Sequence, residues 1–144
     1  MTETTQATAL TLADVVWTRL QDAVGVAVFD GGIFDDHGNP TSPPADEDGR
    51  AAAHAVFYPT PGYARAMLAD GTPDTLGWGF QITCVGGDRT RTLWCLGQVR
   101  GLFQGWRTPG GVVVEEAGDP GPLRRDDDPS PPRFYLPLLF TTTT

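Results

Sequence analysis

The residues able to do chemistry are few, and their spacing does not suit catalysis. Cys84 and Cys95 are the only cysteines of the 144-residue chain, and His37 and His54 are its only histidines. Two cysteines this far apart, with no histidine beside them, do not make a zinc site. The sequence also lacks a nucleophile elbow and a phosphate-binding glycine loop. We therefore expect a protein that is not an enzyme, without catalytic residues, metal or cofactor, whose cysteines are small buried hydrophobic residues in a reducing compartment.

The densest run of charge is acidic. Six acids and no Lys or Arg lie between Asp30 and Gly49, namely Asp30, Asp35, Asp36, Asp46, Glu47 and Asp48. These carboxylates lack the regular spacing and the fixed glycine of a calcium-binding loop. A solvated, flexible loop over about residues 30–50 is the interpretation that we favour.

Overall charge and hydropathy exclude several classes of protein. The formal net charge is −8, which disfavours a nucleic-acid reader, because such a protein needs a basic face. The same charge disfavours binding to an anionic membrane surface. No apolar run approaches the roughly 20 residues that span a bilayer. The polar N-terminal sequence MTETTQATAL has no basic region typical of a signal peptide, so we expect a cytoplasmic, soluble chain.

The elements that position these residues follow from periodicity and turn chemistry. Apolar residues of Thr11–Ala23 fall on one helical face. Residues 24–29 are apolar on both faces, which predicts a strand inside the sheet. Further strands are expected at about residues 52–58, 80–85, 111–116 and 133–140. A second helix is expected at 89–104, with Asp88 as its N-cap.

Three segments leave more open. Residues 61–76 are compatible with one or two helical turns or with a loop. Residues 119–132 are predicted to be a Pro-rich linker. Pro137 lies within the last strand, and because proline cannot donate to a strand ladder, we expect that strand at a sheet edge or with a bulge.

Together these elements predict an α/β chain of the α+β type. A mixed, mainly antiparallel sheet of about five strands is packed by two helices on one side. Residues 1–9 are expected to be a flexible tail, and residues 10–141 to form a single domain.

One helix combines an apolar face with unusual outer residues. A 100° projection of residues 89–104 places Cys95, Leu96 and Val99 on the apolar arc, and Trp94 outside it. The segment from Arg89 to Val114 holds four Arg and no acid, whereas the segments on both sides, 30–48 and 115–128, are acidic. Such segregation either steers like subunits head to tail or results from loop composition. Trp78 and Trp106 are interpreted as covers for the sheet ends.

The order and local composition of these segments resemble those of the tail terminator (tail completion) proteins of long-tailed bacteriophages. The resemblance is carried by LADVVWTRLQDAV, VGVAVFDG, HAVFYP, WGFQITCVGGDRTRTLWCLGQVRGLFQGW, GVVVEEAG and RFYLPLLFTTTT. It covers about residues 10–141. It rests on element order and not on a catalytic signature, and the acidic loop has no fixed counterpart in the family.

The resemblance implies a structural virion protein assembled in the host cytoplasm. Members of the family form hexameric rings at the head-proximal end of the tail tube, stop its polymerisation and present a surface to the head connector. The implied partners are further copies of the chain, the major tail tube protein and head–tail connector proteins. No membrane is involved, and DNA is expected to pass through the ring without direct readout.

The outer residues Arg89, Arg91 and Trp94 are the candidate contacts within the ring or with the tube. Two alternatives stay open. One is another neck, connector or minor tail protein, and the other is a small-ligand-binding α+β domain, which requires an apolar pocket with convergent polar groups.

Overall fold

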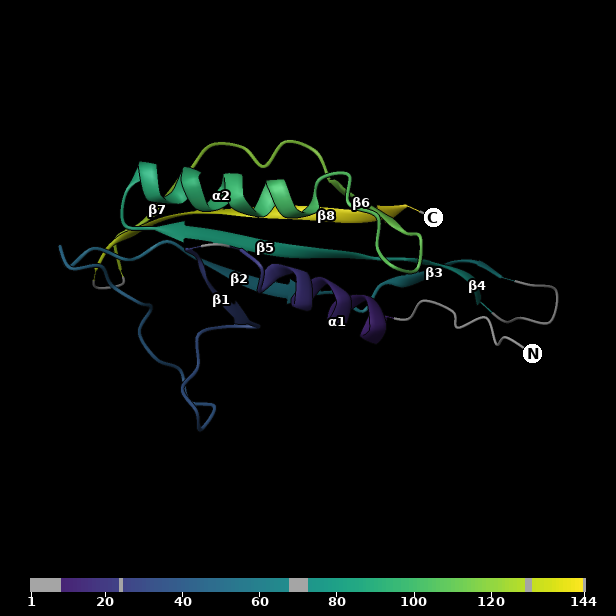
Figure 1. The fold of residues 1–144 in the computed structure, drawn as a ribbon, viewed down its shortest axis with the longest axis horizontal. Helices are drawn as coiled ribbons and strands as arrows, with labels where there is room; N and C mark the ends of the chain where they lie inside the picture. The colour runs from purple at the N-terminus through teal and green to yellow at the C-terminus, as the bar shows by residue number, and fades with distance from the viewer. Residues whose placement is uncertain (1–8, 24, 68–72, 129–130, 144) are drawn as a thin grey trace.

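The computed structural model describes residues 9–23, 25–67, 73–128 and 131–143. In that part of the chain, two helices pack on one face of a six-stranded mixed sheet, and a two-stranded ribbon extends from it (Figure 1). The predicted α+β class is therefore confirmed. The elements are α1 (Ala9–Leu20), β1 (Ala27–Asp30), β2 (His54–Pro59), β3 (Tyr63–Met67), β4 (Pro73–Gly77), β5 (Gly79–Gly86), α2 (Arg89–Phe103), β6 (Val113–Glu116), β7 (Arg124–Asp126) and β8 (Arg133–Thr143).

The sheet has the strand order β1-β2-β5-β8-β6, and β7 pairs with β8 beside β6. Among the described strands, β1 and β2 are the one parallel pair, and the segment 31–53 makes the long connection that a parallel pair requires. Helix α2 connects β5 to β6, which lie on either side of β8 and are both antiparallel to it. This is the single helical crossover that the sequence predicts.

The core lies between the helices and one face of the sheet. Alternation along β5 sends Phe80, Ile82 and Cys84 into it. The ring of Phe80 is central, with centroid distances of 5.9 Å to Phe57, 5.5 Å to Phe103 and 5.1 Å to Phe140. The helices supply the other wall of this core through Leu12, Val16, Leu20, Cys95, Leu96, Val99 and Phe103.

Helix α2 begins where the sequence predicts, because Asp88 caps it. The Asp88 carboxylate accepts a hydrogen bond from the backbone N–H of Arg91 at 2.8 Å. The preceding Gly86 permits a close approach between β5 and the helix, since a Cβ there would lie 2.7 Å from the backbone N of Thr92. Thr92, which the projection did not place in the core, is fully buried and donates its hydroxyl hydrogen to the carbonyl of Asp88 at 2.8 Å.

Several predictions for the N-terminal half need correction. Helix α1 starts at Ala9 and ends at Leu20, because residues 21–23 tighten into a turn, in which the N–H of Ala23 bonds to the carbonyl of Leu20 at 3.0 Å. Strand β1 is shorter than the predicted 24–29 and lies at the sheet edge, not inside the sheet. Its two apolar faces have different partners: Val28 packs on the core, and Phe29 contacts the ring of His54 edge-on.

In the ambiguous segment 61–76, residues 63–67 and 73–76 are strand and not helix. Its described residues form the antiparallel pair β3–β4, in which Tyr63 opposes Gly77. The predicted tail falls on residues 1–8, which lie outside the described residues, and on Ala9, which is helical. The predicted linker 119–132 contains the short strand β7.

The last strand is interior, so the prediction of an edge or bulged strand was wrong. Strand β8 pairs with β5 along one side and with β7 and β6 along the other. On this second side, β7 covers residues 133–135 and β6 covers residues 140–143, so neither pairs with Pro137. The missing N–H of the proline is tolerated inside the sheet because it falls in this gap.

Within the described residues, neither helix is long and apolar enough to cross a bilayer.

Candidate functional site

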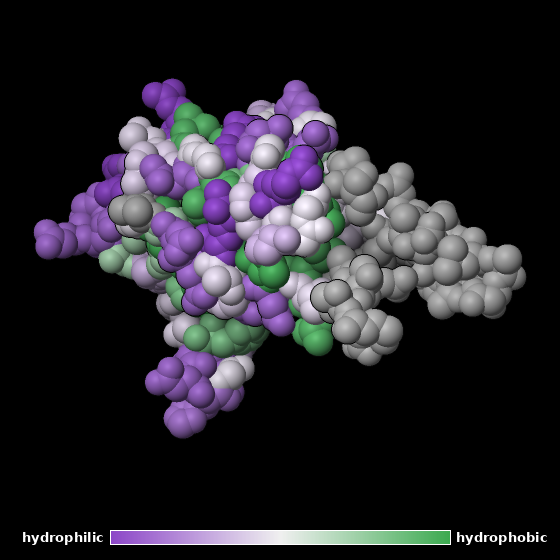
Figure 2. Space-filling view, turned by 45° about the vertical axis from the view of Figure 1, so that its right-hand side comes forward, coloured by the Kyte–Doolittle hydropathy of each residue, from purple (hydrophilic) through white to green (hydrophobic). Residues whose placement is uncertain are grey.

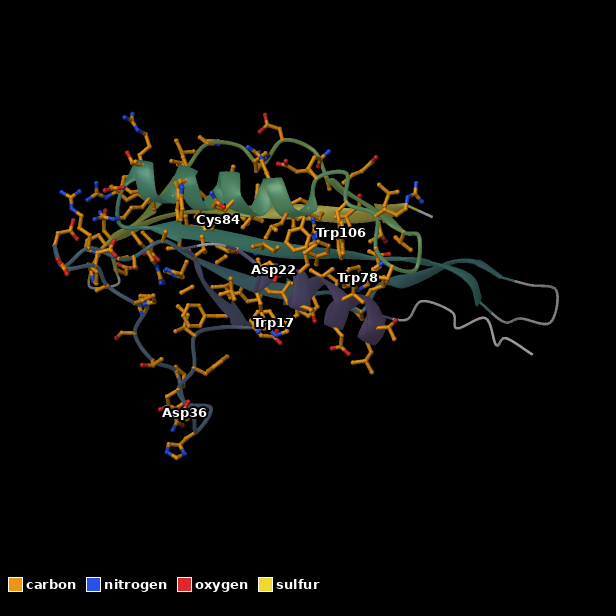
Figure 3. All side chains as sticks on the ribbon, viewed as in Figure 1. Trp17, Asp22, Asp36, Trp78, Cys84 and Trp106 are labelled. Carbon is orange, nitrogen blue, oxygen red and sulfur yellow. The ribbon has the colours of Figure 1, made fainter. Side chains whose placement is uncertain are left out.

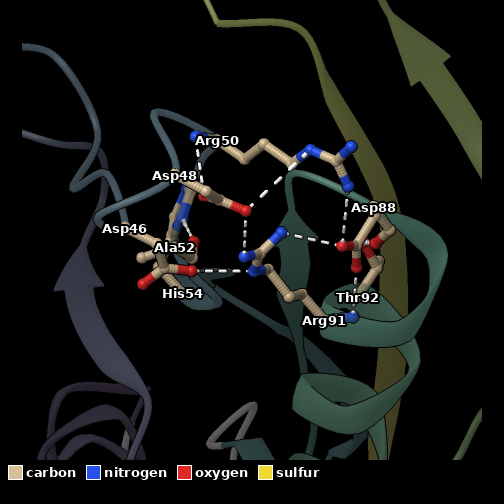
Figure 4. A network of polar contacts seen from close by, with 8 residues as sticks. All are labelled: Asp46, Asp48, Arg50, Ala52, His54, Asp88, Arg91 and Thr92. Carbon is tan, nitrogen blue, oxygen red and sulfur yellow. Dashed lines mark hydrogen bonds and ion pairs between the residues drawn. The ribbon is translucent and has the colours of Figure 1, made fainter.

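Arg91, one of the three candidate contact residues, is the centre of an ion-pair network (Figure 4). Its guanidinium lies 2.7 Å from the carboxylate of Asp46, 2.7 Å from that of Asp48 and 2.7 Å from that of Asp88. Arg50 adds a contact of 3.3 Å to Asp88. The network attaches the turn at 45–51 of the acidic loop to the first turn of α2.

The network also sets the ionisation of its acids. Hydrogen bonding from the Arg91 side chain lowers the pKa of Asp48, and hydrogen bonding from the Arg91 backbone N–H lowers that of Asp88. Both carboxylates therefore stay ionised at neutral pH. The contacts of Arg91 lie within the chain, and the turn at 45–51 that it holds is anchored. The tip of the acidic loop near Asp36 instead stands off the body as a polar projection (Figures 2 and 3).

Replacing Arg91 by methionine is expected to release the 45–51 turn. Asp46 would then have no cation beside it, and Asp48 and Asp88 would keep only the longer contacts of Arg50, at 4.0 and 3.3 Å. The backbone hydrogen bond from Gly87 to Ala51, which is 2.8 Å long, would lose its support. Hydrogen exchange is expected to become faster for the amides of Asp46, Gly49 and Gly87, with little change in the core strands. The matched control is Arg89→Met, which removes the same charge from an exposed position; equal exchange in both variants would contradict this role.

The other two candidates face outward on α2. Arg89 is exposed and forms no ion pair within the described residues. Trp94 is 44% exposed, and the tip of its ring lies over Gly25, where an added Cβ would come within 2.8 Å of the ring. Leu93 beside it is 47% exposed. The structure thus keeps Trp94 outside the core, as the projection predicts, but gives it a contact with the turn after α1.

The charge segregation of the sequence is partly neutralised within the fold. Arg91 pairs with the acidic segment before it, and Arg100 forms a two-pronged contact with Glu116 after it, at 2.9 and 2.7 Å. These pairs satisfy two of the four arginines between Arg89 and Val114. Within the described residues, Arg89 is therefore the arginine at the start of α2 that has no acidic partner.

The two thiols lie side by side between β5 and α2. Both are fully buried, and the Cys95 thiol donates to the carbonyl of His54 at 3.3 Å. Figure 3 shows Cys84 beneath the helix. A hydrogen bond with Cys95 and burial raise the pKa of Cys84 well above its ordinary value, so this thiol is a poor nucleophile. Among the described residues, no group of three or more His, Cys, Asp or Glu side chains could hold a metal ion.

Trp78 and Trp106, which flank the β5–α2 unit in the sequence, cover the end of the core. Trp78 is buried and donates its indole N–H to the carbonyl of Thr60 at 2.6 Å. Trp106 is half-buried, with the guanidinium of Arg19 4.6 Å from its ring centroid. Figure 3 shows both close to α1 at the end of the core.

Among the described residues, His54 is the one buried titratable side chain with an unfilled hydrogen bond. Its Nδ1 lies 2.9 Å from the carbonyl oxygen of Ala52. Because a carbonyl only accepts, Nδ1 carries the proton and Nε2 is the acceptor. Nε2 has no partner within the described residues. Burial lowers the pKa of His54, and the hydrogen bond to Ala52 opposes this more weakly.

This lowered pKa predicts a loss of stability in mild acid. The unfolded chain takes up a proton near the ordinary value of 6.5, whereas the folded chain resists it down to its lower pKa. Protons therefore favour unfolding, and the stability present above pH 6.5 falls as the pH drops below it. Melting curves between pH 7.5 and 5.5 should show this fall, and His54→Phe should reduce it. The control is His37→Ala, at the exposed histidine, which should show the same fall in stability as the wild type. An unchanged fall in His54→Phe would contradict the assignment of this pH dependence to His54.

In comparisons with known proteins, no protein-family model matches the chain and no curated protein matches its sequence.

Proposed function

We propose that the chain is the tail terminator of a long-tailed bacteriophage. In this role it forms a ring of six subunits at the head-proximal end of the tail tube, stops polymerisation of the tube and provides the docking surface for the head connector. Its partners are further copies of itself, the major tail tube protein and the connector proteins. The alternative within the same class is another neck or minor tail protein.

The segments that carry the resemblance coincide with structural elements. They correspond to α1, β1, β2, the β5–α2 unit, β6 and β8. The segments that lie between them, by contrast, are the acidic loop, the β3–β4 ribbon and the short strand β7. The segments on which the resemblance depends are therefore those that form the core of this fold.

The observation that carries the proposal of assembly is the β3–β4 ribbon. It extends beyond the ends of both helices (Figure 1). Among the described residues, β3 pairs only with β4, in a sheet separate from the main one. An isolated two-stranded ribbon is at best marginally stable in water. A neighbouring subunit or the tube would provide the surface on which such an arm packs.

The open sheet adds a second line of support. In the described residues, β1 pairs with one strand and leaves an edge of the sheet open, whereas the outer side of β6 is covered by backbone hydrogen bonds between Val114 and residues 105–106. Unpaired strand edges are sites at which another chain can add. Contact between two different patches on like subunits is heterologous, and it produces a ring when the rotation closes.

The test is assembly on purified tail tubes lacking their terminator. The expected result is a ring on one end of each tube, seen by electron microscopy, and tubes that no longer elongate. Binding at the opposite end, or to the head connector without the tube, would favour the alternative neck or minor tail protein. Sedimentation at several salt concentrations would show whether the charge of −8 keeps the free subunits apart, since salt screens their repulsion.

A shortened ribbon makes the test specific. Tyr63 and Gly77 are cross-strand partners, so residues 64–76 can be replaced by an Asn-Gly turn that joins them. The shortened protein should keep its melting transition but fail to cap tubes. Normal capping by this variant would remove the ribbon from the interface.

A further inference from the structure

A cavity of about 390 Å³ lies on the face of the sheet opposite the helices. Its floor comes from β2, β5 and β8, and its roof from the acidic loop through Gly32, Ile33, Thr41 and Pro43. The exposed residues Thr41 and Tyr58 place its mouth at the surface. The cavity is independent of the α2 face and of the β3–β4 ribbon.

Strand register explains why these side chains converge. His54 opposes Val85, which opposes Tyr135, so one row of three crosses the floor. Val56 and Thr83 belong to the next row. Neighbours on one face of a sheet are close enough to bind one ligand together. The floor is therefore apolar in the middle, with an imidazole at one side and a tyrosine at the other.

His54 supplies the most directional feature of the cavity. It lines the cavity, and its Nε2 is an acceptor without a partner within the described residues. This nitrogen has almost no accessible surface, so a donor reaches it only when a ligand in the cavity moves aside the groups that cover it. An unfilled buried acceptor costs about 1–3 kcal/mol. A hydrogen-bond donor brought into the cavity would remove this cost.

The charges of the cavity argue against an ionic ligand. Arg133 and Asp126 both line it and lie 3.9 Å apart. The guanidinium and the carboxylate therefore largely offset each other. With His54 neutral, the cavity presents no net charge to attract an anion or a metal ion. What remains is an apolar floor flanked by the aromatic rings of Tyr58 and Tyr135.

We propose that this cavity binds a small, uncharged, aromatic group that carries an N–H or O–H donor, with the donor directed at Nε2 of His54. The volume is near the lower end of the range of about 300–1,000 Å³ for ligand sites, which suits one or two fused rings. The same chemistry is offered by a free heteroaromatic molecule and by an aromatic side chain of a peptide.

The simplest probes are indole and indene, which share a ring framework but differ in the N–H group. Each is titrated into the full chain while the amide resonances of Val56, Val85 and Tyr135 are followed by NMR. Indole is expected to give saturable shifts and to bind about tenfold more tightly than indene, as one hydrogen bond predicts. Absence of saturable shifts, or equal affinity for both probes, would overturn the proposal.

Variants separate the hydrogen bond from the shape of the cavity. His54→Phe should bind indole and indene equally, and Thr83→Val, a matched change on the same floor, should keep the preference for indole. If His54→Phe does not fold, Val85→Phe fills the cavity from the adjacent strand and should abolish binding of both. Retained discrimination in His54→Phe, or undiminished binding in Val85→Phe, would contradict the site.

A third probe distinguishes the source of the aromatic group. N-acetyltryptophanamide carries the indole ring on a peptide backbone. If it binds at least as tightly as indole, the natural occupant is a side chain of another polypeptide. If it is excluded while indole binds, the occupant is a free small molecule.

Discussion

Replacing Leu96 by aspartate is expected to unfold the protein. Leu96 is 5% exposed and lies in the core facing the sheet. An unpaired charge at such a position costs several kcal/mol. This is comparable to the whole stability of a domain, about 5–15 kcal/mol. Thermal melting followed by circular dichroism is the measurement, and we expect no cooperative transition, or one displaced far below that of the wild type.

The control for this variant lies on the same helix. Leu93 is 47% exposed, so Leu93→Asp introduces the same charge with little burial. Its effect should stay within about ±0.5 kcal/mol, as at ordinary surface sites. If Leu96→Asp melts within a few degrees of the wild type, or if Leu93→Asp is the more harmful change, the orientation of α2 is wrong.

Replacing Trp94 by alanine is expected to affect assembly far more than stability. The ring is 44% exposed and touches Gly25 only with its tip, so its loss should cost less than the roughly 3–5 kcal/mol of a buried tryptophan. If Trp94 anchors a neighbouring subunit or the tube, its removal should weaken capping by about 2 kcal/mol or more, close to thirtyfold. A melting curve and a capping assay on the same variant distinguish a role of Trp94 in assembly from a role in the fold.

Leu10→Ala is the matched control for Trp94, because Leu10 on α1 is also apolar and is 72% exposed. It should melt and cap normally. A Trp94→Ala variant with a poor melt would instead assign the ring to the fold. Normal results in both assays would remove Trp94 from the interface and leave Arg89 as the remaining outward candidate.

The sequence predicts the β5–α2 unit well because its signals are local. Alternation of Phe80, Ile82 and Cys84, the Gly-Gly turn and the Asp88 cap each depend on residues close in the chain. The strand ladder that surrounds them is not local. The edge position of β1 depends on a parallel pairing across residues 31–53, and the interior position of β8 depends on two short strands that leave Pro137 uncovered.

The candidate site shows the same limit. Projection of the helix places Arg91 and Trp94 on its outer side, but it cannot show that the acidic loop returns to Arg91 through Asp46 and Asp48. The sequence signal for the cavity floor is the alternation along β2, which places His54, Val56 and Tyr58 on one face of the strand. Recognising it required the register that brings Val85 and Tyr135 beside His54.

The burial of both thiols has a practical consequence for locating the interface. Cys84 and Cys95 are the only cysteines, and neither is accessible. On the outer side of α2, Gly97 and Gly101 have open space where a Cβ would lie. A cysteine introduced at Gly97 would therefore be the thiol that a maleimide dye or spin label reaches in the folded chain. Distances between such labels on neighbouring subunits would map the packing of α2 in an assembled ring without removal of a native residue from the core.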